Sequence, residues 1–94
     1  MRTEVVEIYS DTTNCAVLRH PGRRFPGVLV QGDTLYNLCR QADRICLTAR
    51  NVMSADDYEE MDYFREELRT FLSHYKKVMS EHGLSLPFFD TPVD

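Results

Sequence analysis

Hydrophobic and polar positions alternate along the first third of the chain, a pattern that predicts β-strands. Three runs rich in β-branched residues have this character: residues 4–9 (EVVEIY), 15–19 (CAVLR) and 27–31 (GVLVQ). Between the second and third runs, His20-Pro21-Gly22-Arg23 fits a type II turn, with proline in the second position and glycine in the third. The pattern therefore predicts a three-stranded antiparallel meander over residues 1–32.

Hydrophobic positions then change to a helical period. Asp33 is the expected N-cap of a helix over residues 33–51. The helix is expected to bury one stripe, made of Leu35, Leu38, Cys39, Ala42, Ile45, Cys46 and Ala49.

A second, longer helix is predicted over residues 54–83. Ser54 and Asp57 resemble a capping box at its start, and Gly83 is the expected C′ residue of a Schellman motif at its end. Its expected core face consists of Met61, Phe64, Leu68, Phe71, Leu72, Tyr75, Val78 and Met79. Residues 84–94 hold two phenylalanines and two prolines, so an extended tail is expected there.

These elements predict a single α+β domain over residues 1–94, with the meander followed by an antiparallel pair of helices. At 1.5 Å per residue the second helix would measure about 42 Å and the first about 25 Å, so the first cannot cover the second. The sheet, the tail or a second copy of the chain must cover Phe71, Tyr75 and Met79. We favour the sheet and the tail together with self-association, so a homo-oligomer is expected.

Composition narrows the functional classes. A net charge of −4 argues against general nucleic-acid binding. No signal peptide or transmembrane run is visible, so a cytoplasmic protein without a membrane partner is expected. The three cysteines form no CxxC pair, which favours small buried thiols over a metal site.

No catalytic motif is visible, so we expect a protein that is not an enzyme and holds no cofactor or metal. Basic residues gather at residues 19–24 (RHPGRR), which are called the arginine loop from here on. The loop is either a solvated turn or an anion site, because guanidinium groups bind phosphate oxygens bidentately. The expected ligand-binding residues are Arg19, His20, Arg23, Arg24, Tyr36 and Arg40. The leading hypothesis is a binding module for a phosphate-bearing small molecule of the nucleotide type, acting as a sensor or as a phage anti-defence sponge.

The alternative is a protein-blocking module, such as a toxin-immunity or inhibitor protein. Tyr36, Arg40 and Leu47 are expected to form an exposed second face of the first helix, and tyrosine and arginine are common in interfaces. Acidic residues crowd the start of the second helix, a pattern typical of either a solvated helix turn or a surface for a basic partner. The expected interface residues are Tyr63, Glu60, Glu67 and Leu47.

Two motifs carry a resemblance to a known family. The run RFPG at residues 24–27, followed by QGDTL at residues 31–35, resembles the pattern of a family of small bacterial and phage proteins with no known activity. The ending EHGLSLP at residues 81–87 also fits the pattern of that family. The resemblance implies a cytosolic bacterial or phage setting and transfers no functional residue.

Overall fold

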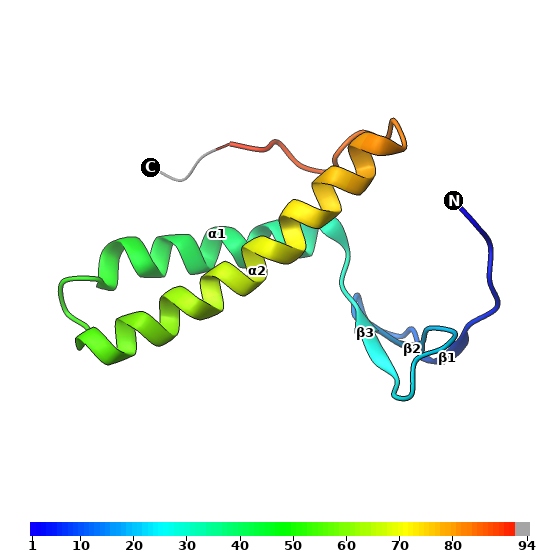
Figure 1. Ribbon diagram of the computed structural model, residues 1–94, viewed down its shortest axis with the longest axis horizontal. Helices are drawn as coiled ribbons and strands as arrows, with labels where there is room; N and C mark the ends of the chain where they lie inside the picture. The colour runs from blue at the N-terminus through cyan, green and yellow to red at the C-terminus, as the bar shows by residue number, and fades with distance from the viewer. Residues whose placement is uncertain (92–94) are drawn as a thin grey trace. The chain divides into compact units, whose positions relative to one another are not determined.

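The computed structural model describes residues 1–91, and it has three strands followed by two helices (Figure 1). The elements are β1 (Glu7–Ser10), β2 (Ala16–Arg19), β3 (Gly27–Leu29), α1 (Gly32–Ala49) and α2 (Ala55–Glu81). The strands form one antiparallel sheet in the order β1-β2-β3. The predicted α+β fold is therefore confirmed. Residues 92–94 of the expected tail lie outside the described residues.

The chain divides into two compact units, Met1–Gln31 and Gly32–Asp94. In the first unit, the turn after β2 has the geometry that the sequence predicts. Gly22 has a φ of 82°, and the Arg23 N–H donates to the carbonyl of His20 at 3.0 Å. Only glycine adopts such a positive φ without strain, which is why it occupies the third position of this type II turn.

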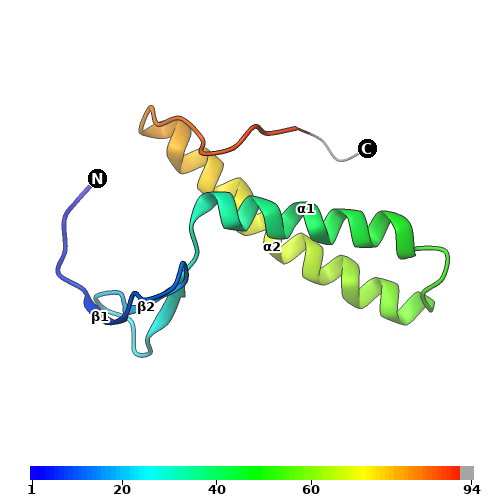
Figure 2. The same cartoon turned by 180° about the vertical axis from the view of Figure 1, so that it is seen from behind.

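The second unit is a helical hairpin, in which α1 and α2 lie side by side and run in opposite directions (Figures 1 and 2). The seam between them buries the small side chains of Cys39, Ala42 and Cys46 of α1, and Cys39 packs in one cluster with Leu72 of α2. Small side chains let helix backbones approach closely, so several of the large apolar side chains lie outside the seam.

The predicted core stripes are consequently wrong at four large residues. Leu38, Ile45, Phe64 and Phe71 are exposed along the edges of the helical hairpin. Tyr36, which was expected on an exposed second face of α1, is instead buried and only 8% exposed. The helical period gives the spacing of the buried residues, but the small side chains decide which positions enter the seam.

Two of the three predicted signals at the helix ends are present in the structure. Asp33 was expected to precede α1, but α1 already begins at Gly32, so Asp33 lies in the first turn. The Ser54 hydroxyl accepts the Asp57 N–H at 3.1 Å, as the capping motif predicts. At the other end of α2, Gly83 has a φ of 66° and the Leu84 N–H reaches the Met79 carbonyl at 2.9 Å, which confirms the Schellman motif.

The cysteines are all free thiols. Cys39 and Cys46 are buried as expected, whereas Cys15 is exposed, contrary to expectation. Burial raises the pKa of the Cys39 thiol, so it stays protonated and behaves as a small apolar side chain. Within the described residues, neither helix has the length and apolarity that a membrane crossing requires.

Gly32 offers a direct test of the helix packing. A methyl group added at Gly32 would overlap the ring of Tyr75, whereas one added at Gly27 would meet no atom within 4 Å. We expect Gly32→Ala to lower the free energy of unfolding by about 1–3 kcal/mol, the usual effect of overpacking. Gly27→Ala, the matched control, should change it by less than about 0.5 kcal/mol. Urea unfolding followed by helical circular dichroism measures both, and equal effects would contradict the close contact.

Candidate functional site

The arginine loop joins β2 to β3 and belongs entirely to the first unit. The first of its arginines is already paired within the sheet. The register of the β1–β2 ladder sets Glu7 opposite Arg19, and their side chains form an ion pair. The hydrogen bond from Arg19, and after it the one from Tyr9, lowers the pKa of Glu7. Glu7 therefore stays charged at neutral pH and holds Arg19 against the sheet.

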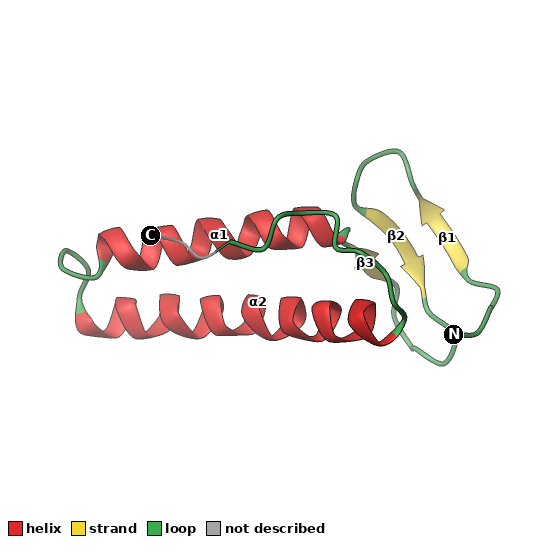
Figure 3. Cartoon of the chain, turned by 90° about the horizontal axis from the view of Figure 1, so that it is seen from above, coloured by secondary structure: helices red, strands yellow, loops and turns green. Residues whose placement is uncertain are grey.

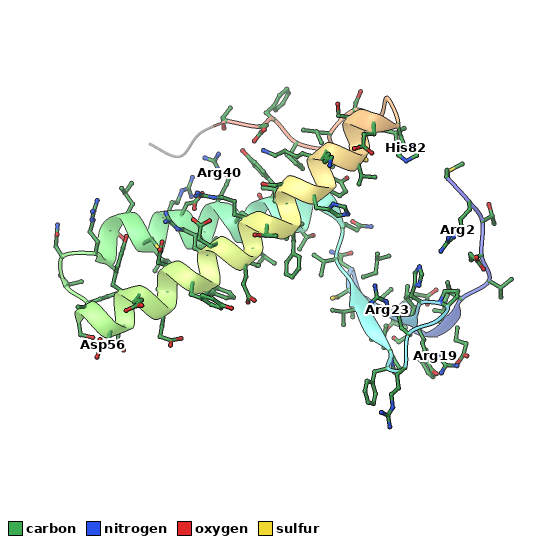
Figure 4. The ribbon with its side chains drawn as sticks, viewed as in Figure 1. Arg2, Arg19, Arg23, Arg40, Asp56 and His82 are labelled. Carbon is green, nitrogen blue, oxygen red and sulfur yellow. The ribbon has the colours of Figure 1, made fainter. Side chains whose placement is uncertain are left out.

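Arg23 and Arg24 differ from Arg19 because neither is in an ion pair with any of residues 1–91. Both are exposed at the tip of the first unit, where Figure 4 marks Arg19 and Arg23. The Arg24 guanidinium lies 5.3 Å from the centre of the Phe25 ring, so the aromatic ring orients it without neutralising it. The loop thus presents two cationic side chains whose charge is unmatched in the described chain.

A hollow of about 410 Å³ lies beside these arginines. Its lining combines basic and apolar side chains: His20, Arg23, Arg24, Leu18, Phe25, Gly27, Val28 and Leu29. A second hollow of about 330 Å³ shares His20 and Arg23 and also contains Glu7 and Arg19. Hollows of this size suit a small ligand, and the first one offers an apolar wall next to anion-binding groups.

Tyr36 and Arg40, the other two expected ligand-binding residues, belong to the second unit. Both form hydrogen bonds with the tail, the segment of residues 84–91 that follows α2. The Tyr36 hydroxyl donates to the Phe89 carbonyl at 2.7 Å and accepts the Thr91 N–H at 3.1 Å. Arg40 donates to the Tyr36 hydroxyl at 2.9 Å and to the Thr91 carbonyl at 2.8 Å. Figure 4 shows Arg40 pointing from α1 toward the tail.

Two further contacts hold the tail along α1, where Figure 3 shows it from above. The Phe88 ring stacks on Tyr36 with centroids 4.1 Å apart and an interplanar angle of 11°. Lys76 of α2 pairs with Asp90 at 2.9 Å. The hydrogen bond with the Thr91 side chain, followed by those from the Thr91 backbone and from Arg40, lowers the pKa of Tyr36. The polar groups of Tyr36, Arg40 and Thr91 are therefore hydrogen-bonded to one another, next to the stacked rings of Tyr36 and Phe88.

The expected interface residues do not share one surface. Glu60 and Tyr63 line an acidic hollow of about 460 Å³ at the start of α2, where Figure 4 marks Asp56. Glu67 lies seven residues, or two helical turns, after Glu60 and so continues this face. Leu47 lies on α1, one position after the buried Cys46, and helical geometry sends it to the side of the hairpin that carries Arg40.

No group of three or more histidine, cysteine, aspartate or glutamate side chains in residues 1–91 has the arrangement that a metal ion needs. The tail was expected as a cover for the helices, but the contacts of Asp90 and Thr91 with Lys76, Tyr36 and Arg40 were not predicted. Their signal was the run FFDT at residues 88–91, whose aromatic and acidic side chains suit Tyr36 and Lys76. The contact joins positions 55 residues apart, and local sequence patterns carry no such information.

The sequence profile of a family of unknown function, DUF6959, matches residues 1–88, and the chain belongs to this family. The match covers the sheet, both helices and Phe88. No curated protein and no solved structure matches the chain.

The Tyr36 hydroxyl offers a test of the tail contact. Tyr36→Phe keeps the stack on Phe88 but removes every hydrogen bond of the hydroxyl, so we expect the free energy of unfolding to fall by about 1–3 kcal/mol. Tyr63→Phe is the matched control, because Tyr63 is exposed. Urea unfolding gives the energies, and limited proteolysis reports release of the tail. Equal behaviour of the two variants would show that the tail is not held through Tyr36.

Proposed function

We propose that the chain is a non-enzymatic binding module that captures a phosphate-bearing small molecule of the nucleotide type at the arginine loop. The observation that supports this most is the pair of unmatched cations, Arg23 and Arg24, beside a hollow with an apolar wall. An unpaired exposed arginine gains more from a phosphate than one already bound to a carboxylate, because no existing ion pair has to break.

The lining of the hollow favours a ligand with two chemically different parts. A planar guanidinium group can donate two parallel hydrogen bonds to two oxygens of a phosphate. Leu18, Phe25 and Val28 add an apolar surface against which a flat ring could pack. A nucleotide has both parts, whereas inorganic phosphate has only one. His20 lies in both hollows and can add a further donor.

The proposed binding residues are His20, Arg23 and Arg24. Arg19 is available to the ligand only when its ion pair with Glu7 is broken. Tyr36 and Arg40 are not included, because the tail already satisfies their polar groups. In this proposal the protein is cytoplasmic, of bacterial or phage origin, and works as a sensor or as a sponge for a nucleotide-type signal.

A second candidate function is a protein-blocking module, in which the acidic start of α2 meets a basic partner. The observation in its favour is the exposure of Tyr63, at 67%, beside the acidic hollow that contains Glu60. Tyrosine is enriched among the residues that contribute most to binding in protein interfaces. Glu60→Lys with Glu67→Lys should abolish binding of a protein partner and leave nucleotide binding at the arginine loop unchanged.

The main test removes the two unmatched cations. Isothermal calorimetry at about 100 μM protein should show saturable heat with nucleotides or cyclic nucleotides, at a concentration that detects weak sites. Arg23→Ala with Arg24→Ala should weaken binding more than tenfold, because each charge-assisted hydrogen bond contributes about 1.5–3 kcal/mol. Arg44→Ala with Arg50→Ala removes the same charge from the second unit and should have little effect. Absence of heat with every nucleotide would contradict the proposal.

Glu7 provides a test in the opposite direction. Glu7→Gln removes the carboxylate that occupies Arg19, so we expect affinity for the same nucleotide to rise about two- to fivefold, the range of an exposed ion pair. Glu4→Gln is the matched control, because it removes the same charge from a pair with Arg2 outside both hollows. An equal rise in both variants would indicate a general charge effect rather than release of Arg19.

A further inference from the structure

The large apolar side chains that are exposed on the two helices include Leu38, Ile45, Phe64 and Phe71, and these four are called the apolar stripe. Leu38 and Ile45 of α1 are 40% and 49% exposed, and Phe64 and Phe71 of α2 are 51% and 61% exposed. On each helix the two residues are seven positions apart, which is two helical turns, so they lie in line along the helix.

The apolar stripe lies on one side of the helical hairpin. Leu38, Ile45 and Phe71 each come one position before a buried residue of the seam, namely Cys39, Cys46 and Leu72. In two antiparallel helices, residues displaced from the seam in the same rotational sense fall on the same side of the pair. Leu38 and Ile45 therefore face the same way as Phe64 and Phe71.

The tail covers the opposite side. Arg40 and Ser73 each come one position after a buried seam residue, so they are displaced in the other sense, and both line the hollow that contains Asp90 and Thr91. On this side the tail contacts Tyr36 and Arg40 of α1 and leaves a hollow of about 390 Å³, while the other side presents two rows of aromatic and aliphatic side chains. Exposed apolar side chains gathered on one face are typical of an interaction site.

We propose that a second copy of the chain covers the apolar stripe, so that two helical hairpins form a four-helix bundle. A two-fold interface needs a surface that complements itself, and the stripe has this property because both helices carry apolar positions at the same spacing. With 18 residues, α1 is about 27 Å long, and a helix with its side chains is about 10 Å wide. Over that length, two helices side by side therefore present about 540 Å² in flat projection. The accessible area of a ridged helix surface exceeds its projection, and each partner of a stable interface buries roughly 800 Å², so the bundle has to use the whole of this face.

Charge determines which helices meet. Beside the stripe, α2 carries Glu60, Glu67 and His74, whereas the equivalent positions of α1 carry Thr34, Gln41 and Thr48. If α2 packed on α2 of the other copy, four carboxylates would face one another. If α1 packs on α2 of the other copy, each acidic row faces a neutral one. The second arrangement avoids the repulsion, so we assign α1 to α2 across the two-fold axis.

This inference is independent of the proposed function, because the arginine loop belongs to the other unit. Sedimentation velocity over about 1–300 μM protein tests it. The wild-type chain should be a dimer at the upper concentrations, and Ile45→Glu should make it monomeric at all of them. Leu47→Glu is the matched control: Leu47 is 50% exposed on the same helix but on the tail side, and its variant should remain dimeric.

A monomeric wild-type chain would overturn the inference and would assign the stripe to a different protein. Equal effects of Ile45→Glu and Leu47→Glu would overturn it as well. Two variants that leave the apolar side chains in place keep the test valid if Ile45→Glu fails to fold. Gln41→Lys should tighten the dimer about two- to fivefold by facing the partner's Glu67, and Gln41→Glu should weaken it by a similar factor. No difference between these two variants would contradict the pairing of α1 with α2.

Discussion

The seam between α1 and α2 is the contact on which the rest of the helical unit depends. It is built from small side chains, Cys39, Ala42 and Cys46, and it ends at Gly32, where Tyr75 occupies the space that a Cβ would need. Close approach of the backbones follows from this choice of residues. Apart from Tyr36 and Leu72, the fully buried hydrophobic residues are small, and several large ones, such as Phe64 and Phe71, are exposed beside the seam.

The two sides of the helix pair differ in what packs against them. On one side, Phe88 of the tail stacks on Tyr36, and Arg40 donates hydrogen bonds to the carbonyl and the hydroxyl of Thr91. On the other side, Phe64 and Phe71 remain exposed. The helical unit therefore combines a side on which the tail packs with a side on which apolar side chains are exposed. The arginine loop lies in the separate first unit, so capture of a small anion and association with another chain need not compete for the same residues.

The elements and their ends could be predicted because local signals specify them. The Pro-Gly turn at His20, the Ser54 cap and the Gly83 terminus each depend on residues within one turn of the chain, and all three have the expected geometry. The burial of Tyr36 could not be predicted in this way. Helical periodicity allows several neighbouring stripes, and the choice among them depends on side-chain size in the partner helix and on a tail contact 55 residues away.

The candidate site shows the same difference between local signals and tertiary contacts. Arg23 and Arg24 were identified from a local cluster of charge, and their lack of an ion-pair partner among residues 1–91 agrees with an anion-binding role. Arg19, Tyr36 and Arg40 also carry groups that can donate a hydrogen bond to an anion, but Glu7 or the tail already engages them. Sequence alone gives the chemical type of a side chain, whereas its availability depends on tertiary neighbours.

The central claim, that the arginine loop binds a phosphate-bearing ligand, is tested most directly by titrating the ¹⁵N-labelled full-length chain with pyrophosphate and then with ATP. The account predicts saturable shifts of backbone amide signals confined to residues 18–29, with larger shifts for ATP because its base can reach the apolar wall. Shifts centred on Tyr36 and Arg40, or no shifts at millimolar ligand, would contradict it.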